Sequence, residues 1–217
     1  MNERNWLQEK RAQRVIRNLN KNCMNGFYFA SAREAVPEIL KQIPDGAVVG
    51  LGDSLTLQQT GIISALEQGD YHLLNPWAKM DAQQKFEMQR RIFTADVFVV
   101  GTNAITLEGE LINMDGRGNR VAAMIFGPKK VLVVAGTNKI VRDREEGFRR
   151  IREIAGPANA QRHRWFPEDL QPPCATTGFC SDCKPPATIC CALTVIRGQR
   201  TDKDRINVFL LGEELGL

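Results

Sequence analysis

The sequence lacks any apolar run long enough to cross a membrane. A membrane-spanning helix needs about 20 consecutive apolar residues, and no stretch of the 217 residues approaches that length. Residues 1–6 are polar and charged, and they lack the apolar core of a secretory signal peptide. We therefore expect a cytoplasmic protein without a membrane span.

Several functional signatures are also missing. The chain carries 29 lysines and arginines against 25 aspartates and glutamates, and this small, scattered excess indicates no nucleic-acid partner. No Gly-x-Gly-x-x-Gly run is present, so no flavin or NAD motif is seen. The two histidines, His72 and His163, have no ligand-spaced partner, and we interpret both as structural.

The composition that is present, 43% hydrophobic and 25% charged, is typical of a globular protein. Apolar strand patterns cover residues 27–30, 47–51, 71–74, 96–101 and 131–135. Helical patterns cover residues 2–22, 31–43, 55–67, 79–94, 118–126 and 142–154. This alternation predicts an α/β fold, with an open, mainly parallel sheet and helices on both faces. Two late strand patterns, 194–197 and 206–211, are expected to return to this sheet.

The character of the chain changes after residue 156. Residues 157–191 contain six of the ten prolines and five of the six cysteines. We expect an α/β domain made of residues 1–156 and 192–217, with a Cys- and Pro-rich loop insertion of residues 157–191. Trp77, Trp165 and Phe166 flank proline-containing loops and are expected to pack this appendage onto the core. Arg149, Arg150 and Arg152 are interpreted as the solvated face of a helix.

Polar, glycine-containing segments follow two of the predicted strands. In a parallel sheet such segments meet at the carboxyl edge, where backbone amides and helix N-termini bind anions. After strand 47–51 the candidate ligand-binding residues are Gly52, Asp53, Ser54 and Thr56, although Asp53 or Ser54 could instead cap a helix. After strand 96–101 the candidates are Asn103, Asn113, Asp115, Gly116, Asn119 and Arg120. Lys139, beyond strand 131–135, is a further candidate anion contact.

Arg120 has two interpretations. A guanidinium near the start of a helix opposes the helix dipole unless an anion or a carboxylate lies beside it. Arg120 therefore either lines a ligand site together with Asn119, or forms an internal salt bridge with Asp115.

The cysteines form the second strong signal. Cys174, Cys180, Cys183 and Cys190 follow one another in a short segment stiffened by prolines. Four thiolates from one loop can bind an iron–sulfur cluster or a zinc ion, and the alternatives are a redox dithiol or reduced structural cysteines. Cys191 is adjacent to Cys190 and would have difficulty pointing at the same centre. Cys23 is expected to be a buried core residue.

The segment from Asn103 to Val141, with its run Gly109-Glu-Leu-Ile-Asn-Met-Asp-Gly-Arg-Gly-Asn-Arg120, resembles the LUD (lactate-utilisation) domain family. More broadly, residues 48–141 resemble the superfamily of ribose-5-phosphate isomerase A, glucosamine-6-phosphate deaminase and the CoA transferases. The cysteine segment is similar to the tail of one LUD subgroup. Where several sugar-phosphate isomerases carry an aspartate, this chain has Asn103, which cannot act as a general base. Asp115 and Glu108 are the candidate replacements.

The resemblance implies a bacterial protein involved in lactate utilisation, the oxidation of L-lactate to pyruvate by a complex of iron–sulfur proteins. The chain would then bind a small anionic metabolite, and other iron–sulfur subunits of lactate utilisation would be its partners. The alternative is a transferase or isomerase-like enzyme for a CoA thioester or a phosphorylated metabolite, with a structural zinc site. A third hypothesis is a non-catalytic accessory subunit.

Overall fold

The computed structural model describes residues 3–163, 167 and 170–217, so that Trp165 and Phe166 lie outside the described residues. The helices are α1 (Glu3–Lys21), α2 (Ala32–Leu40), α3 (Leu55–Gln59), α4 (Ile62–Glu67), α5 (Ala82–Arg91), α6 (Asn119–Ile125), α7 (Arg144–Arg150), α8 (Gly156–Arg162) and α9 (Cys174–Thr177). The strands are β1 (Asn25–Phe29), β2 (Val48–Leu51), β3 (His72–Leu74), β4 (Val97–Val100), β5 (Ala104–Thr106), β6 (Leu111–Asp115), β7 (Lys130–Gly136), β8 (Ile140–Val141), β9 (Ala192–Ile196) and β10 (Ile206–Leu211). Short 3-10 turns, η1 (Ile92–Thr94) and η2 (Thr137–Lys139), and a π-helical turn, η3 (Ile151–Ala155), complete the order.

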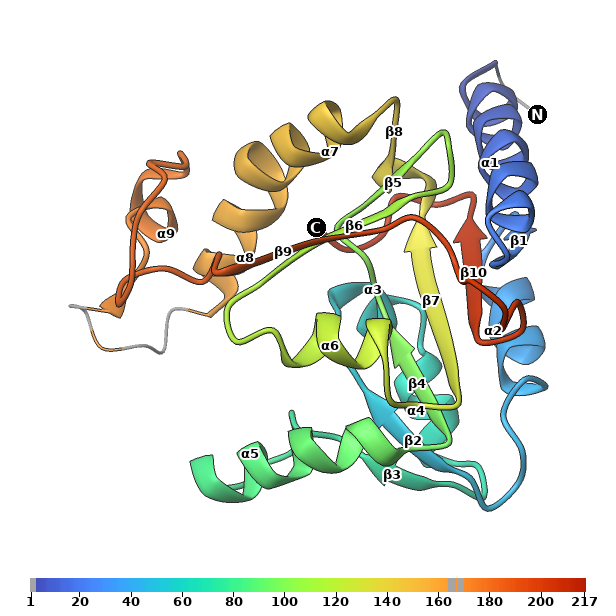
Figure 1. Ribbon diagram of the computed structural model, residues 1–217, viewed down its shortest axis with the longest axis horizontal. Coiled ribbons are helices and arrows are strands. Elements are labelled where there is room, and N and C mark those ends of the chain that lie inside the picture. Colours follow the sequence, from blue (N-terminus) through green and yellow to red (C-terminus); the bar gives the residue numbers. More distant parts are fainter. Residues whose placement is uncertain (1–2, 164–166, 168–169) are drawn as a thin grey trace.

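A six-stranded sheet with the order β1-β10-β7-β4-β2-β3 forms the centre of the molecule (Figure 1). Every neighbouring pair of strands in it is parallel. The predicted open α/β fold with a mainly parallel sheet is therefore confirmed. Among the described residues, no helix is long and apolar enough to span a membrane.

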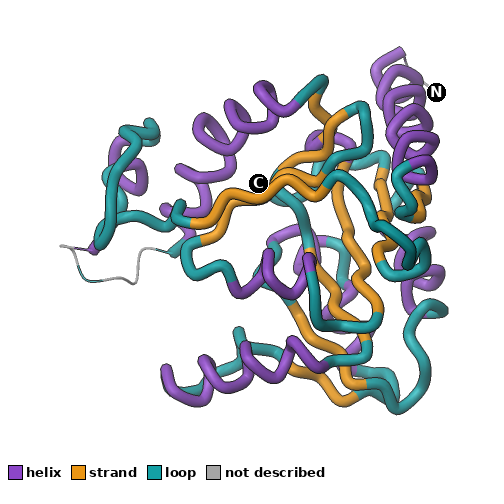
Figure 2. The backbone as a smooth tube through the Cα atoms, viewed as in Figure 1, coloured by secondary structure: helices purple, strands orange, loops and turns teal. Residues whose placement is uncertain are grey.

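Both faces of this sheet are buried, because successive side chains of a strand point to opposite faces. Val131 and Val133 of β7 pack in one core with residues of α1 and α6. Leu132 and Val134 pack in another core with residues of α2, α3 and α4. The continuous apolar run of β7 thus reflects a strand covered by helices on both sides, as Figure 2 shows.

A second sheet, with the order β8-β5-β6-β9, was not expected from the sequence. Its strands β5 and β6 lie inside the segment that the polar residues and glycines marked as a turn, but Ile105, Leu111 and Ile112 within it are fully buried. The strand pattern at 194–197 also joins this second sheet, where β9 pairs antiparallel with β6. Its expected return to the central sheet is therefore wrong, whereas β10 does return there.

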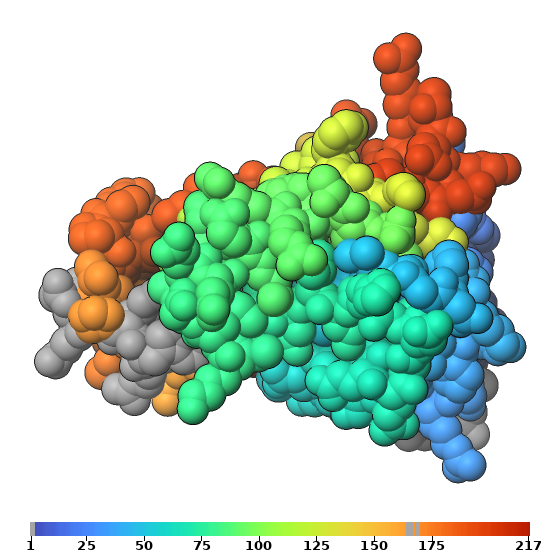
Figure 3. All heavy atoms as spheres, turned by 90° about the horizontal axis from the view of Figure 1, so that it is seen from below, coloured from blue at the N-terminus to red at the C-terminus, as the bar shows by residue number. Residues whose placement is uncertain are grey.

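The cysteine-rich segment lies at one end of the molecule, beyond α7, and its atoms are orange in Figure 3. It begins with a helix where a loop was expected, because α8 continues the helical backbone of α7 and η3, with Pro157 in its first turn. Trp77 lies against the end of this helix, with its ring 6.1 Å from that of His163.

Candidate functional site

The loops that follow β2, β4 and β7 meet at the carboxyl edge of the central sheet, because these three strands are parallel neighbours. Gly101, directly after β4, permits the close approach of the β2 loop: a Cβ atom there would lie only 2.6 Å from Ser54 Oγ. Ser54 itself caps α3, since its hydroxyl accepts a hydrogen bond from the Leu57 amide.

A cavity of about 400 Å³ opens at this edge, and we call it the sheet-edge cavity. Eight of the predicted ligand-binding residues line it: Asp53, Ser54, Asn103, Asp115, Gly116, Asn119, Arg120 and Lys139. Three others, Gly52, Thr56 and Asn113, are not part of its lining. Gly52 packs against Val100, Thr56 contacts Lys139, and Asn113 is fully buried.

Arg120 and Asp115 form an internal salt bridge of 2.7 Å, with side chains only 13% and 7% exposed. The Arg120 guanidinium also donates to Asn113 Oδ1 at 2.7 Å, to Asn103 Oδ1 at 3.1 Å and to the carbonyl oxygens of Gly101 and Met114. The salt-bridge interpretation of Arg120 thus describes its observed contacts. The network fixes the end of β4 against β6 and the start of α6.

The two candidate general bases have different surroundings. The Asp115 carboxylate accepts hydrogen bonds from the backbone amides of Arg120 and Val121, so it caps α6 in addition to pairing with the guanidinium. Glu108 does not line the sheet-edge cavity; it lies between β5 and β6, largely exposed, and forms a 2.7 Å ion pair with Arg14 of α1. Neither carboxylate is placed as an unpaired base in this cavity.

Helix α8 adds residues that the sequence analysis did not assign to a site. His163 Nε2 lies 2.8 Å from the Asp53 carboxylate, and Arg162 forms an ion pair with the same carboxylate. Burial alone would raise the pKa of Asp53, but the hydrogen bond from His163 and the charge of Arg162 outweigh it and lower the pKa. Lys85 Nζ lies 4.0 Å from the centre of the Trp77 ring beside them.

All four added residues, Trp77, Lys85, Arg162 and His163, line the sheet-edge cavity. They come from α8 and from the segment around α5, both remote in sequence from the two glycine-containing loops. In the sequence, only the adjacent basic residues Arg162 and His163 could have suggested an anion-binding role for α8. No sequence pattern indicates that they contact Asp53.

Lys139 is the most deeply buried cation of this cavity, with only 4% of its surface exposed. Its Nζ donates a hydrogen bond to Thr56 Oγ1 at 2.9 Å. Burial lowers the pKa of Lys139 to about 7, and the positive charges of Arg150 and Arg120 act in the same direction. Within the described part of the chain, no carboxylate forms an ion pair with this amine.

Arg150 is not part of a solvated helix face, as the sequence suggested for the cluster of arginines. It is 7% exposed and donates to the backbone oxygens of Asn103, Asn138 and Leu217. The interpretation is wrong for Arg150 because its guanidinium faces these backbone oxygens rather than solvent, whereas Arg149 and Arg152 are exposed as expected.

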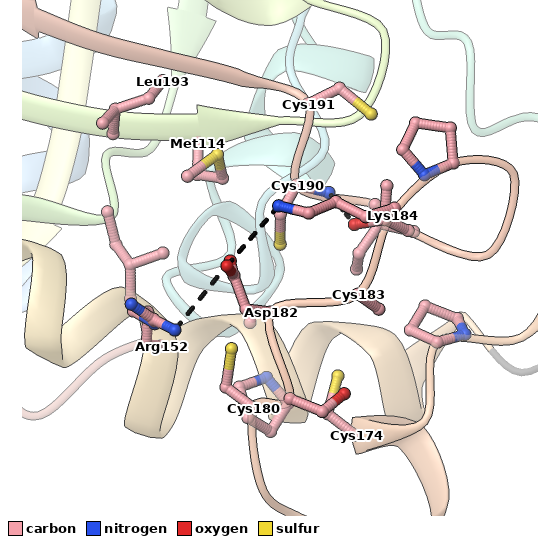
Figure 4. A pocket seen from close by; sticks show the side chains of 18 of the residues that line it. Met114, Arg152, Cys174, Cys180, Asp182, Cys183, Lys184, Cys190, Cys191 and Leu193 are labelled. Carbon is pink, nitrogen blue, oxygen red and sulfur yellow. Dashed lines mark hydrogen bonds and ion pairs between the residues drawn. The ribbon is translucent and has the colours of Figure 1, made fainter.

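A second cavity, of about 470 Å³, lies in the appendage, and we call it the cysteine cavity (Figure 4). Its lining includes Cys174, Cys180, Cys183, Cys190 and Cys191. Cys23 is remote, at the end of α1, and is partly buried rather than fully buried as expected. Burial raises the pKa of the Cys190 thiol to about 11, and the neighbouring Cys174, Cys183, Cys180 and Cys191 add to this effect.

The thiols are not close enough to one another to surround a single metal ion. Over residues 3–163, 167 and 170–217, no three histidine, cysteine, aspartate or glutamate side chains lie closely enough to hold a metal ion. In Figure 4 the sulfur atoms of Cys174, Cys180 and Cys190 face a common space, whereas that of Cys191 points away from it.

The two cavities share a wall. Met114, from β6, and Ile189, directly before the cysteine pair, line both of them. The backbone of Ile189 also packs against Gly116, where a Cβ atom would lie 3.4 Å from the Ile189 carbonyl oxygen. One layer of side chains therefore separates the sheet-edge cavity from the cysteine cavity.

Comparison with known families identifies the fold that carries these cavities. The sequence profile of the LUD domain matches residues 12–211, nearly the whole chain. The chain belongs to the LUD-domain family. This LUD domain is similar to the crystal structure of a DUF162 family protein from Deinococcus radiodurans, with a TM-score of 0.53 and 14% sequence identity, covering 94% of this chain and 98% of that chain. At this identity the likeness shows the common fold.

The structure of eIF2B delta from Chaetomium thermophilum was also matched, with a TM-score of 0.36 and 18% identity over 55% of this LUD domain and 51% of that chain. A comparison with curated proteins found no match. The LUD-domain family is associated with lactate utilisation in general terms.

Proposed function

We propose that this LUD domain binds a small organic anion, a hydroxy or keto acid of lactate utilisation, in the sheet-edge cavity. The observation that carries the proposal is Lys139, a buried amine at the carboxyl edge of the sheet to which no described carboxylate is paired. A charged group in such a place is costly unless a counter-charge accompanies it. A bound carboxylate would supply that charge.

The charges around the cavity support the same conclusion. Five cationic side chains line it, Lys85, Arg117, Arg120, Lys139 and Arg162, against the carboxylates of Asp53 and Asp115. Both carboxylates are already paired, Asp115 with Arg120 and Asp53 with Arg162 and His163. The remaining positive potential therefore favours an anionic ligand.

Two hydrogen-bond donors of the lining also support a polar ligand. The buried Trp77 Nε1 and Arg162 Nε meet no acceptor among the residues that the structure describes. Buried donors are rarely left without a partner, and a carboxylate or hydroxyl oxygen of a ligand would satisfy them.

In the cell, we propose that the domain works with other iron–sulfur subunits of lactate utilisation. The domain would hold the organic anion at the sheet-edge cavity, with the Asp53–His163 pair beside it. The association of the family with lactate utilisation supports this assignment.

Calorimetric titration with L-lactate, pyruvate and the uncharged analogue lactamide tests the proposal. We expect the two acids to bind and lactamide to bind far more weakly. Lys139→Met should lower the affinity for the acids about 10- to 150-fold, because a charged hydrogen bond contributes about 1.5–3 kcal/mol. Lys203→Met, at an exposed lysine far from the cavity, is the matched control and should bind as the wild type does.

The affinity should also fall as the pH rises above about 7, because Lys139 then loses its charge. Arg120 and Arg150, the charged groups that act on it, keep their charge in this range. Binding of ribose 5-phosphate or CoA, without binding of either acid, would overturn the proposal in favour of a transferase or isomerase. Acid binding unaffected by Lys139→Met would show that the ligand lies elsewhere.

A further inference from the structure

Lys139 is a buried amine that lines a cavity. Its side chain belongs to the lining of the sheet-edge cavity although only 4% of the residue is exposed. A lysine on an open surface is strongly hydrated and stays protonated, whereas a lysine that is withdrawn from water can serve as a nucleophile. The position of Lys139 therefore allows chemistry with a bound ligand in addition to a charge contact.

The segment that carries Lys139 is fixed by the chain after β10. Lys139 ends η2, and its neighbour Asn138 forms two hydrogen bonds with Leu215, one from its side-chain amide to the carbonyl oxygen and one from the Leu215 amide to Oδ1. Gly216 lies directly against the amine, since a Cβ atom there would be only 2.9 Å from Lys139 Nζ. The left-handed φ of Gly216, 70°, also favours glycine at this place. Lys139 is thus held in position before any ligand arrives, which lowers the entropic cost of a reaction there.

The contacts of Lys139 accommodate a neutral amine as well as an ammonium group. Its hydrogen-bond partner Thr56 is fully buried, and a hydroxyl can accept from an ammonium or donate to a neutral amine. Burial, and then the charges of Arg150 and Arg120, lower the pKa of Lys139 to about 7. At pH 7 about half of this amine is therefore neutral, roughly a thousand times the neutral fraction of an ordinary lysine.

Other groups of the cavity can share the binding of a carboxylate. Trp77 Nε1 and Arg162 Nε are buried donors without an acceptor among the described residues, and both residues line the cavity. Lys85 adds a further positive charge to the same lining. A 2-keto acid held by these groups has a carbonyl carbon next to its carboxylate, and that carbon is an electrophile for an amine.

We propose that Lys139 forms a reversible imine with the C2 carbonyl of a 2-keto acid such as pyruvate in the sheet-edge cavity. The inference rests on the proposed function and narrows it, because L-lactate has no carbonyl and would bind there only non-covalently. The lone pair of Nζ attacks C2, so that a C–N bond forms while the C=O π bond breaks, and the oxygen takes one proton of the amine. The resulting hydroxyl group then leaves as water with the second amine proton as the C=N bond forms.

This step needs no oxidant, reductant or further reactant. Protonation of the imine gives an iminium group with the same single positive charge as the ammonium group of Lys139. The carboxylate of the ligand therefore keeps a cation beside it, and the charge argument for anion binding remains unchanged.

The test is reductive trapping of the full chain at pH 7 with pyruvate and sodium cyanoborohydride, which reduces an imine to a stable secondary amine. We expect the intact mass to increase by one pyruvic acid less one oxygen atom, and peptide mapping to place this increase on Lys139. L-lactate should give no adduct, and an excess of L-lactate should reduce the trapping of pyruvate because the two acids share the cavity.

Variants and the other lysines serve as controls. Lys139→Met should lower the yield of the adduct about 10-fold or more, since a surface lysine has far less neutral amine at this pH. Lys203→Met, at an exposed lysine, should form the adduct as the wild type does. Circular dichroism shows whether each variant is folded, and mapping of the wild type gives the site without any variant. An adduct on Lys85, or one spread evenly over the surface lysines, would overturn the proposal.

Failure of the imine and failure of the anion site give different results. Pyruvate that binds in calorimetry but is never trapped would overturn the imine and leave the proposed function intact. Trapping at Lys139 that excess L-lactate does not reduce, with no binding of L-lactate in calorimetry, would support the imine and contradict a site shared by both acids.

Discussion

Arg120 directs its donor groups toward the protein interior. Its guanidinium pairs with Asp115 and donates to Asn113, Asn103 and two backbone carbonyls, so that the ends of β4 and β6 and the start of α6 are joined through one side chain. Such a residue fixes the relative positions of the elements that line the cavity. Lys139 is the opposite case, because its amine has a single hydrogen bond, to Thr56, in the described structure.

Arg120→Ala should therefore destabilise the fold by about 3–5 kcal/mol, because it leaves the buried Asp115 carboxylate without its partner. Urea unfolding measures this change. Arg117→Ala, at an exposed arginine of the same cavity, is the control and should change the stability by less than about 0.5 kcal/mol. An Arg120→Ala protein of wild-type stability that has lost only anion affinity would show that Arg120 contacts the ligand directly.

Lys139→Met should stabilise the free protein although it removes anion binding. The folded pKa of Lys139, about 7, lies below its ordinary value of 10.5, so burial of the charge opposes folding fully below pH 7 and progressively less toward pH 10.5. After allowing for the lost hydrogen bond to Thr56, the gain at pH 6 should be about 2–4 kcal/mol. Thermal unfolding from pH 6 to 10 should show this gain shrinking as the pH rises; a constant difference would contradict the assigned pKa.

At the scale of elements, α8 connects the appendage to the central sheet. Its last residue, Arg162, and the following His163 both contact Asp53 in the loop after β2. The side chains of all three are at most 23% exposed, so this ion-pair cluster is only weakly screened by solvent. The docking of α8 thus depends on one carboxylate that the sequence suggested as a ligand contact or a helix cap.

Asp53→Asn should loosen α8 and the cysteine-rich segment while the central sheet stays folded, at a cost of about 1–3 kcal/mol. Limited proteolysis should cleave residues 157–191 faster in the variant. The pKa of Asp53 is lowered from 3.8, so its contribution is present above about pH 4 and is lost as the pH falls through the folded value. Wild-type protein should accordingly become as sensitive as the variant at low pH, and equal cleavage of both proteins at pH 7 would contradict this role.

At the scale of the whole molecule, the central sheet and the cysteine-rich appendage differ in how much apolar surface they bury. The sheet has extensive apolar cores on both faces, whereas the appendage has one small cluster of buried residues around Ala160, Cys174 and Ala175. Such a small core contributes little hydrophobic stabilisation. A metal centre bound by the cysteines would supply much of the folding free energy of this segment.

If the metal site predicted from the sequence is present, Cys183→Ser should release the metal and expose residues 172–191 to proteolysis, while the unfolding temperature of the sheet domain changes little. Cys191→Ser is the matched control and should behave as the wild type does. Both variants must be prepared without oxygen, and metal content is measured on the same samples. A segment that stays protected in metal-free wild-type protein would show that side-chain packing alone holds it.

The sequence by itself determined the central architecture and the location of the sheet-edge cavity. Continuous apolar runs such as that of β7 can only be buried on both faces, and parallel strands necessarily bring the loops after β2 and β4 to one edge. The polar residues of those loops can therefore be assigned to one region from the sequence alone. The concentration of six prolines and five cysteines in residues 157–191 likewise predicted a separate appendage.

Only the tertiary structure decided which of these side chains already form ion pairs or hydrogen bonds with other residues of the protein. Local sequence does not show that Arg120 meets Asp115, Asn113 and Asn103 at once, that Glu108 pairs with Arg14 on a distant helix, or that His163 reaches Asp53. It also does not reveal the strands β5 and β6. Their apolar side chains are buried because Ile105 and Leu111 pack in one core with residues of α1, and Ile112 packs in another with Val141 and Ile151. These contacts join residues far apart in the chain, and long-range packing, which no local pattern encodes, sets the pKa of Lys139 and the wall between the two cavities.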